Sequence, residues 1–280
     1  MTHHTFVVSG FVDEIGPSLD EQLDLLESIG ITHLDVRSLD ETNVLDLTAE
    51  DVERMRDALE ERDIGVTSIG SPIGKIDIDD PFEPHLERFE TALDRAEAFG
   101  TEYVRIFSYY LPDDADPSDY RDEVIDRTRQ KVELAEERDI TLLLENEGGL
   151  YGDTPERVRD VLTTIDSPHL RAVFDPANYL LVGVTPYPDA LVQVVEYVEQ
   201  LHIKDATFGE DGDIVPAGEG DGEIPATLEA LERRGFHGAL SLEPHLVVAG
   251  AGGGYSGPDG FTRAAEALVD VLDEIDANYI

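Results

Sequence analysis

Residues 140–146 read ITLLLEN, and this stretch decides the fold class of the chain. A continuous apolar run of this length is typical of a strand that is buried on both faces of a parallel sheet. Thr154 and Pro155 follow at the positions of a helix cap and of the first helical residue. The segment therefore predicts a buried strand followed by a helix, and the same order continues in both directions along the chain.

Eight segments carry the strand pattern, at residues 5–11, 33–38, 65–71, 101–110, 140–146, 169–175, 200–205 and 238–244. Helical segments follow the strands at residues 15–30, 82–100, 188–199, 224–235 and 258–275. Three further helices are predicted: one from Thr48 to near Gly65, one that ends at Glu137, and one that begins at Thr154. The first helix carries a capping box from Ser18 to Glu21. Eight such units predict a closed (β/α)8 TIM barrel. A doubly wound open sheet is the alternative, but its glycine-rich GxGxxG turn after the first strand is missing. We expect residues 1–280 to form a single α/β TIM-barrel domain.

The composition excludes several classes of protein. The chain has 280 residues, no cysteine, and 63 Asp+Glu against 20 Lys+Arg, which gives a formal net charge of −43. Such a charge repels nucleic acid, since binding to phosphates depends on Lys and Arg. The sequence shows neither a membrane-spanning apolar run nor the basic start of a signal peptide, so we expect a cytoplasmic location. The acidic helices and the scarcity of lysine are typical of a halophilic protein, with an acidic mesophilic protein as the alternative.

Four candidate metal ligands end consecutive apolar runs, namely Glu145, Asp175, His202 and Glu243. The active sites of TIM barrels lie at the carboxyl ends of the strands, so these side chains are expected to meet. Three carboxylates and one imidazole suit a single divalent ion such as Mn²⁺, Mg²⁺, Co²⁺ or Zn²⁺. Three carboxylates that share a buried site also need a cation. Each acidic residue alone could instead cap the following helix, but the series of four favours a metal.

Five weaker candidates for substrate binding lie at the same predicted mouth: Lys75, Arg105, Asn178, Lys204 and His245. For Lys204, an ordinary salt bridge to Asp205 is an equal alternative. Arg105 could hold a carboxylate or phosphate, or pair with Glu145 or Glu102. Asn178 could orient Asp175, contact substrate or serve only in a turn. Other residues at the predicted mouth receive no role, among them Glu14, Asp35, Arg37 and Glu147.

Two glycine-rich stretches follow the last two predicted strands, at residues 218–223 and 250–260. Loops at these places of a barrel often bind phosphate. These two add acidic residues, and no basic residue precedes Arg263 in the second one. We therefore interpret them as turns or a mobile lid.

The segments that carry the candidate residues resemble those of a known family: SPIGK (71–75), RIFSYY (105–110), LLLENEGG (142–149), VFDPANYL (173–180), LHIKD (201–205), VPAGEGDGEI (215–224) and LSLEP (240–244). The family is that of sugar phosphate isomerases and epimerases with a xylose isomerase-like TIM barrel, which includes ketose 3-epimerases, hydroxypyruvate isomerases and inosose dehydratases. The resemblance covers essentially the whole chain. It implies that Glu145, Asp175, His202 and Glu243 hold one divalent metal, and that the two glutamates are the catalytic acid/base pair.

The resemblance also implies a class of chemistry. A metal on a substrate carbonyl stabilises the enediolate that forms when the neighbouring carbon loses a proton. Return of the proton to the other face is epimerisation, and return to the adjacent carbon is isomerisation. Expulsion of a β-hydroxide is dehydration, so an inosose-type dehydratase is the alternative. An endonuclease IV-like nuclease is a remote one, because that branch uses more histidines and the charge opposes DNA. We expect a small carbohydrate substrate, no nucleic-acid or membrane partner, and leave a homo-oligomer open.

Overall fold

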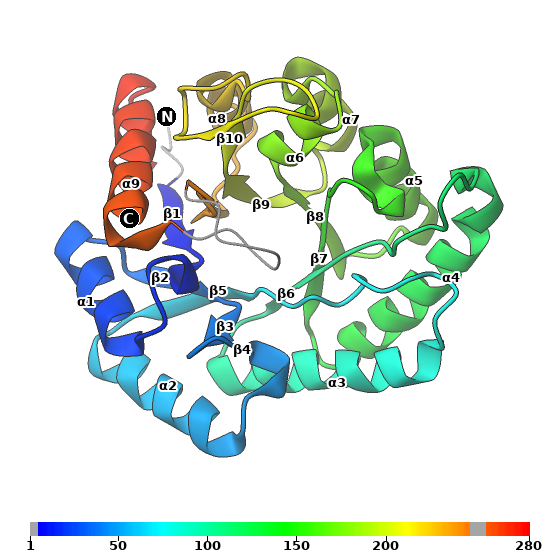
Figure 1. Cartoon of the computed structure of the whole chain (residues 1–280), viewed down its shortest axis with the longest axis horizontal. Helices are drawn as coiled ribbons and strands as arrows, with labels where there is room; N and C mark the ends of the chain where they lie inside the picture. Colours follow the sequence, from blue (N-terminus) through cyan, green and yellow to red (C-terminus); the bar gives the residue numbers. More distant parts are fainter. Residues whose placement is uncertain (1–4, 247–255) are drawn as a thin grey trace.

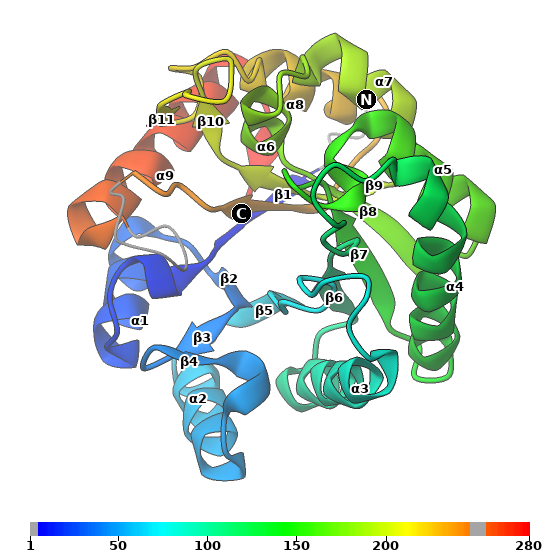
Figure 2. The same cartoon turned by 45° about the vertical axis from the view of Figure 1, so that its right-hand side comes forward.

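The computed structural model describes residues 5–246 and 256–280, which form a ring of parallel strands with helices around it (Figure 1). The strands of the main sheet are hydrogen-bonded in the order β13-β1-β12-β9-β8-β7-β6-β5-β2, with parallel pairings. Phe11, which follows β1, forms a parallel bridge with Asp35 in β2 and so brings these two strands together. Figure 2 shows the same ring turned by 45°. The predicted TIM barrel is confirmed.

The barrel strands are β1 (Thr5–Gly10), β2 (His33–Val36), β5 (Gly65–Ile69), β6 (Tyr103–Ile106), β7 (Thr141–Glu145), β8 (Leu170–Phe174), β9 (Val198–Ile203) and β12 (Ala239–Leu242). The short strand β13 (Asn278–Tyr279) pairs with the start of β1. Two small hairpins, β3 (Ser38–Leu39) with β4 (Thr42–Asn43) and β10 (Asp205–Ala206) with β11 (Ile214–Val215), follow β2 and β9. Each barrel strand lies within its predicted segment except β9, which begins earlier.

The helices are α1 (Leu19–Ile29), α2 (Ala49–Glu61), α3 (Phe82–Phe99), α4 (Pro117–Glu136), α5 (Pro155–Ile165), α6 (Pro176–Leu181), α7 (Leu191–Val194), α8 (Ile224–Glu232) and α9 (Gly257–Glu274). The described residues also contain single helical turns, namely η1 (Val12–Glu14), η2 (Val44–Asp46), η3 (Tyr151–Asp153) and η4 (Pro186–Ala190). Ser18 caps α1 by accepting a hydrogen bond from the Glu21 amide. The reciprocal capping box is found instead at α2, between Thr48 and Asp51. None of the helices in the described ranges is long and apolar enough to cross a membrane.

The prediction of one helix over residues 188–199 is wrong. The structure has the turn η4, the single helical turn α7, and then β9 from Val198 onward. Val198 is buried and pairs with Ala172 of β8, so pairing within the sheet overrides the local helical pattern. The sequence also missed α6, which begins directly after Asp175 with Pro176 in its first turn. Both errors concern very short helices, whose formation depends on tertiary contacts more than on local propensity.

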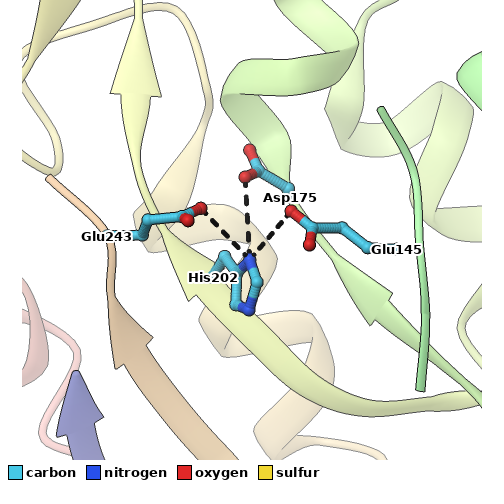
Figure 3. A group of neighbouring side chains, drawn as sticks. All are labelled: Glu145, Asp175, His202 and Glu243. Carbon is cyan, nitrogen blue, oxygen red and sulfur yellow. Dashed lines mark hydrogen bonds and ion pairs between the residues drawn. The ribbon is translucent and has the colours of Figure 1, made fainter. Parts of the chain in front are cut away.

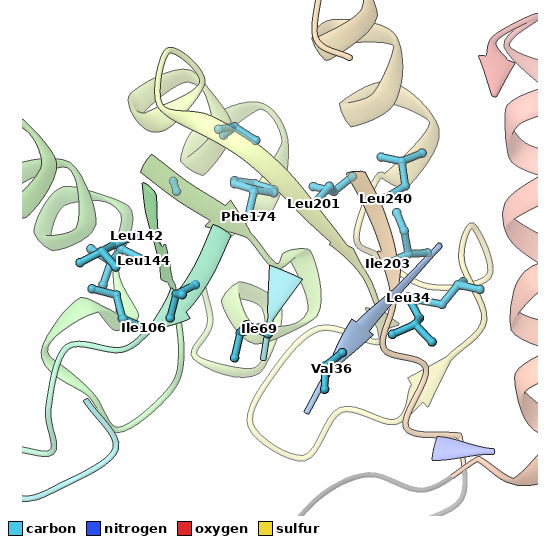
Figure 4. Close-up of a cluster of buried hydrophobic side chains, with 14 of the residues drawn as sticks. Leu34, Val36, Ile69, Ile106, Leu142, Leu144, Phe174, Leu201, Ile203 and Leu240 are labelled. Atoms are coloured by element: carbon cyan, nitrogen blue, oxygen red, sulfur yellow. The ribbon is translucent and has the colours of Figure 1, made fainter. Parts of the chain in front are cut away.

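The apolar core lies between the strands and the surrounding helices (Figure 4). Alternate residues of β7 and β9 contribute to it, including Leu142 and Leu144 on β7 and Leu201 and Ile203 on β9. Because side chains alternate between the two faces of a strand, the intervening residues belong to the barrel interior. The two candidate ligands Glu145 and His202 fall in this interior-facing set.

The interior of the barrel holds a buried polar cluster around Asp35 of β2. Its Oδ1 accepts hydrogen bonds from Ser68 (2.5 Å) and Gln200 (2.8 Å), and its Oδ2 from Ser9 (2.8 Å) and Ser241 (2.6 Å). These four donors come from β5, β9, β1 and β12, so one carboxylate joins five strands. The sequence had placed Asp35 at the mouth, and the structure places it deeper. It therefore supports the strands from which the candidate ligands project.

Candidate metal centre

The four predicted ligands converge at the carboxyl end of neighbouring strands (Figure 3). Glu145 is the last residue of β7, Asp175 directly follows β8, His202 lies in β9 and Glu243 directly follows β12. The order β7-β8-β9-β12 is also their spatial order in the sheet. Parallel strands place their carboxyl ends at one edge, which is why residues separated by as many as 98 positions come together there.

One ligand atom from each of these residues lies within 4.8 Å of the others, and all four side chains are buried. His202 Nδ1 is 3.0 Å from Glu145 Oε1, 3.4 Å from Glu243 Oε2 and 3.9 Å from Asp175 Oδ2. Figure 3 shows the three carboxylates arranged around this nitrogen. Such spacings are those of donor atoms that can share one ion, because ligand bonds to divalent metals are about 2.0–2.6 Å long.

Two carboxylate oxygens of the cluster have no hydrogen bond, and this suits a divalent cation. Asp175 Oδ2 and Glu145 Oε2 are buried and accept no hydrogen bond from the described residues. Their close partners are instead the cations Lys204, 2.8 Å from Asp175 Oδ2, and Arg105, 3.3 Å from Glu145 Oε2, so neither oxygen is committed to a neutral donor. Oxygen ligands with one imidazole suit Mn²⁺, Mg²⁺, Co²⁺ or Zn²⁺, and their chemistry does not choose among these ions.

Asp175 both caps a helix and faces the cluster. Its Oδ1 accepts a hydrogen bond from the backbone amide of Asn178 at 2.9 Å and so caps α6. Its Oδ2 is the atom directed at His202. The two roles that the sequence presented as alternatives for this carboxylate therefore coexist, one on each oxygen.

Three permanently charged side chains surround the carboxylates. Lys204 Nζ is 2.8 Å from Asp175 Oδ2 and 3.1 Å from Glu243 Oε2, and Arg105 Nη1 is 3.3 Å from Glu145 Oε2. Arg37, to which the sequence gave no role, places Nη1 at 2.9 Å from Glu243 Oε1. The need for a cation that we inferred from the sequence is therefore met in part by the protein itself. Lys204 forms these pairs, and not the salt bridge to Asp205 that the sequence left open as an alternative.

Phe11 packs against both arginines and the candidate histidine. The guanidinium carbons of Arg37 and Arg105 lie 4.7 Å and 5.0 Å from the centre of its ring. The ring also meets the imidazole of His202 edge-on, with centres 5.2 Å apart. The contact of each guanidinium with this ring is a favourable cation–π interaction. Phe11 thereby fixes the position of two of the charged groups that contact the glutamates.

The charges of the cluster determine its ionisation in the absence of a metal. Burial lowers the pKa of His202, but Glu145 and Glu243 outweigh burial and raise this pKa to about 10. Burial raises the pKa of Glu145, yet the charges of His202 and Arg105 hold it below its ordinary value. Burial likewise opposes ionisation of Glu243, and Lys204 contributes most to lowering its pKa. Both glutamates are thus ionised at neutral pH, as proton acceptors must be.

Asp175 responds differently. Burial raises its pKa, and the attraction of Lys204 offsets this only in part. The neighbouring carboxylates of Glu145 and Glu243 raise the pKa further. A further cation beside this carboxyl group would therefore favour its ionised form.

The other predicted substrate-binding residues lie at different distances from the cluster. Asn178 donates a hydrogen bond from Nδ2 to Glu145 Oε1 at 3.3 Å, so it orients a ligand and is more than a turn residue. His245 Nε2 lies 3.6 Å from Glu243 Oε1 and 3.1 Å from Glu14 Oε1. Burial lowers the pKa of His245, but Glu243 and Glu14 outweigh it and raise this pKa to about 9.

Lys75 forms an ion pair with Glu147 at 2.8 Å and lies over the ring of Phe107, so the structure does not pair it with a ligand.

The first glycine-rich loop surrounds a carboxylate of the protein. The amides of Gly218, Gly220 and Gly222 donate hydrogen bonds to the side chain of Asp205 at 2.8–3.1 Å. A cradle of backbone amides of this kind would otherwise be suited to an anion. It is filled here, which agrees with the interpretation of residues 218–223 as a turn. Most of the second stretch, residues 250–255, lies outside the described residues.

Comparison with known proteins identifies the family. The family model described as xylose isomerase-like TIM barrel matches residues 23–271, and the chain belongs to this family. An uncharacterised protein of Methanocaldococcus jannaschii is 28% identical over 166 residues, which is 56% of each chain, so the match spans about half of that relative's length. Among solved structures, the zinc-bound IolI protein has a TM-score of 0.78 at 17% identity, with 96% of this chain and 99% of that chain covered. A D-tagatose 3-epimerase-like protein has a TM-score of 0.76 at 18% identity, with 97% and 98% covered.

Proposed function

We propose that the protein is a divalent-metal-dependent isomerase or epimerase of a small sugar or a related polyhydroxylated carbonyl compound. The observation that carries this proposal is the arrangement of two buried, ionised glutamates at one four-ligand cluster. Glu145 and Glu243 approach His202 from opposite sides in Figure 3, on strands separated by β8 and β9. The family membership and the zinc atom bound in the IolI structure support a bound metal.

A divalent ion held by Glu145, Asp175, His202 and Glu243 would polarise a substrate carbonyl and stabilise the negative charge that develops beside it. Glu145 and Glu243 could then exchange a proton with carbon from two sides. Arg105 contacts both glutamates, at 3.3 Å and 3.7 Å, and its charge helps to lower the pKa of Glu145. Two proton acceptors on opposite sides of one carbon suit epimerisation. Use of the same pair at adjacent carbons gives isomerisation.

Solvent-deuterium exchange tests this proposal. The protein loaded with Mn²⁺ should incorporate deuterium into at least one member of a panel of ketoses, inososes and hydroxypyruvate. The labelled carbon identifies where the proton leaves, and loss of water from the substrate would instead reveal a dehydratase. If no member of the panel showed metal-dependent exchange, the proposed substrate class would be contradicted.

The variants Glu145→Gln and Glu243→Gln separate proton transfer from metal binding. Each keeps a neutral oxygen for the metal but removes a proton acceptor, so turnover should fall about 10²–10⁴-fold with metal still bound. In an epimerase, each variant should retain exchange with one epimer and lose it with the other. Glu147→Gln, at the rim and paired with Lys75, is the matched control and should stay near the wild-type rate. Full turnover in both cluster variants would place the acid/base roles elsewhere.

A further inference from the structure

Lys204 has an unusual position within the cluster. It follows β9, two residues after the ligand His202, and is only 5% exposed. Its Nζ lies 2.8 Å from Asp175 Oδ2 and donates a hydrogen bond to Glu243 Oε2 at 3.1 Å. The described residues give this ammonium no other hydrogen bond or ion pair. A buried positive charge therefore lies directly against two of the proposed ligands.

Lys204 contacts the particular oxygens that a metal would need. The other oxygen of Asp175, Oδ1, is committed to the amide of Asn178 and caps α6. The other oxygen of Glu243, Oε1, accepts a hydrogen bond from Arg37 at 2.9 Å. Each carboxylate thus has one oxygen left for an ion in the cluster, and Lys204 lies against both of them.

The nearby arginine differs from Lys204 in how it is held. Arg105 donates hydrogen bonds to the backbone carbonyls of Gly70 and Ser71, and its guanidinium packs against Phe11 and Phe107. These contacts fix it independently of the carboxylates. The ammonium of Lys204 is held by Asp175 and Glu243 alone, at the end of a flexible four-carbon stem. Of the two cations, Lys204 is the one that can leave its position when another cation arrives.

We propose that Lys204 is the internal counter-ion of the metal centre. It neutralises Asp175 and Glu243 in the metal-free protein, and a divalent ion has to displace it from these two oxygens in order to bind. The proposal rests on the metal centre of the proposed function and adds a consequence for this chain. Lys204 stabilises the fold without metal and weakens metal affinity, so that the ion is exchangeable.

Calorimetric titration of the metal-free protein with Mn²⁺ tests the competition. Lys204→Met removes the charge but keeps a long apolar stem, so the dissociation constant should fall by about tenfold or more, because a positive charge no longer repels the ion. Lys75→Met removes another lysine at the mouth, whose partner Glu147 is not a ligand, and should leave the affinity unchanged. A purely structural role for Lys204 predicts the opposite result, a weaker affinity.

Thermal unfolding gives a second readout. Without metal, Lys204→Met should melt at a lower temperature than the wild type, since Asp175 and Glu243 lose their neutralising partner. Saturating Mn²⁺ should raise its melting temperature more than that of the wild type. If Lys204→Met fails to fold without metal, Lys204→Gln, which keeps a hydrogen-bond donor, takes its place in both measurements.

The outcomes separate the two proposals. Mn²⁺ binding by the wild type and by Lys75→Met, with equal or weaker binding by the Lys204 variant, would overturn the counter-ion role and leave the metal centre intact. Absence of binding in every protein would overturn the metal centre itself. Tighter binding confined to the Lys204 variant is the result we expect.

Discussion

The barrel contains buried carboxylates in two neighbouring regions with opposite environments. Asp35, in the interior, accepts four hydrogen bonds from Ser9, Ser68, Gln200 and Ser241, and all four donors are neutral. The ligand cluster, two residues further along β9 and β12, leaves Glu145 Oε2 and Asp175 Oδ2 without a hydrogen bond and surrounds its carboxylates with cations. The two regions share burial and charge but differ in how the oxygens are satisfied.

This difference separates the saturated carboxylates from the candidate metal ligands. Neutral donors that fill every lone pair fix a carboxylate in place and leave nothing for a ligand. Asp205 is a second saturated case, because the amides of the glycine-rich loop and of Ala206 occupy its oxygens. Asp175 and Glu145 each keep an oxygen without a hydrogen bond, and the described residues hold Lys204, beside Asp175, through carboxylates alone, so this cluster can accept a new partner. Burial of an acid alone would not have distinguished these groups.

The largest effect should come from breaking the saturated region. Asp35→Ala removes the shared acceptor of four buried donors. Ser9 and Gln200 keep Thr67 and Ser241 as partners, but Ser68 and Ser241 are left without an acceptor, and each such group costs about 1–3 kcal/mol. We expect the free energy of unfolding to fall by about 4 kcal/mol or more, measured by urea denaturation. Glu147→Gln, at the rim, serves as the control and should change stability by less than about 1 kcal/mol.

A loss from Asp35→Ala as small as that of the control would mean that the hydrogen bonds around Asp35 contribute little to the fold.

The second prediction breaks the open region. His202→Ala removes the only nitrogen of the ligand cluster, and metal affinity should fall by more than about 100-fold while the fold is retained. Titration with Mn²⁺ measures the affinity, and circular dichroism checks the fold. His245→Ala is the matched control, because this imidazole also lies near Glu243 but is not in the ligand set. Equal losses in both variants would show that the mouth binds the ion without a defined histidine ligand.

The third prediction sharpens the comparison through pH. The pKa of His202 is raised from 6.5 to about 10 in the metal-free protein, so its ionic contacts stabilise that form fully below about pH 6.5 and are lost as the pH rises toward 10. A bound divalent ion requires the neutral imidazole, so the metal-bound form has no such ionic contacts to lose as the pH rises. The gap in melting temperature between Mg²⁺-saturated and metal-free protein should therefore widen from about pH 6.5 to about pH 8.5.

The same gap measured in His202→Ala should stay constant over this range. A wild-type gap that narrows would contradict the ionisation described for the cluster.

The ligand cluster could be predicted from sequence because each member has a local signal. Glu145 and Asp175 end apolar runs, and parallel topology brings the ends of successive strands together whatever the loops between them do. The same reasoning placed the eight strands within a few residues. Short helices such as α6 were missed, since their formation depends on the cap that Asp175 supplies only in the folded barrel.

Contacts across the barrel could not be predicted. Arg37 reaches Glu243 over 206 residues of sequence, through the approach of β1 and β2 to β12. Asp35 lies in β2 and Arg37 directly follows this strand, and the pattern alone does not say which of them lies at the mouth. That depth is set by the stagger of strands around the barrel. Alternation along β2 was the only signal that both side chains face the interior.

The smallest expected effect is that of salt on the stability that Asp35 contributes to the fold. The chain carries 63 acidic against 20 basic residues, and about 1 M KCl screens charge interactions beyond about 3 Å. The melting temperature of the wild type should therefore rise steeply from dilute buffer to molar KCl.

Asp35 and its four donors are buried, so screening hardly reaches them. The stability difference between wild type and Asp35→Ala, measured by urea denaturation at each salt concentration, should change by less than about 0.5 kcal/mol. A penalty that shrinks markedly in salt would show that Asp35 is coupled to the acidic surface, and a salt-independent wild type would contradict the predicted surface repulsion.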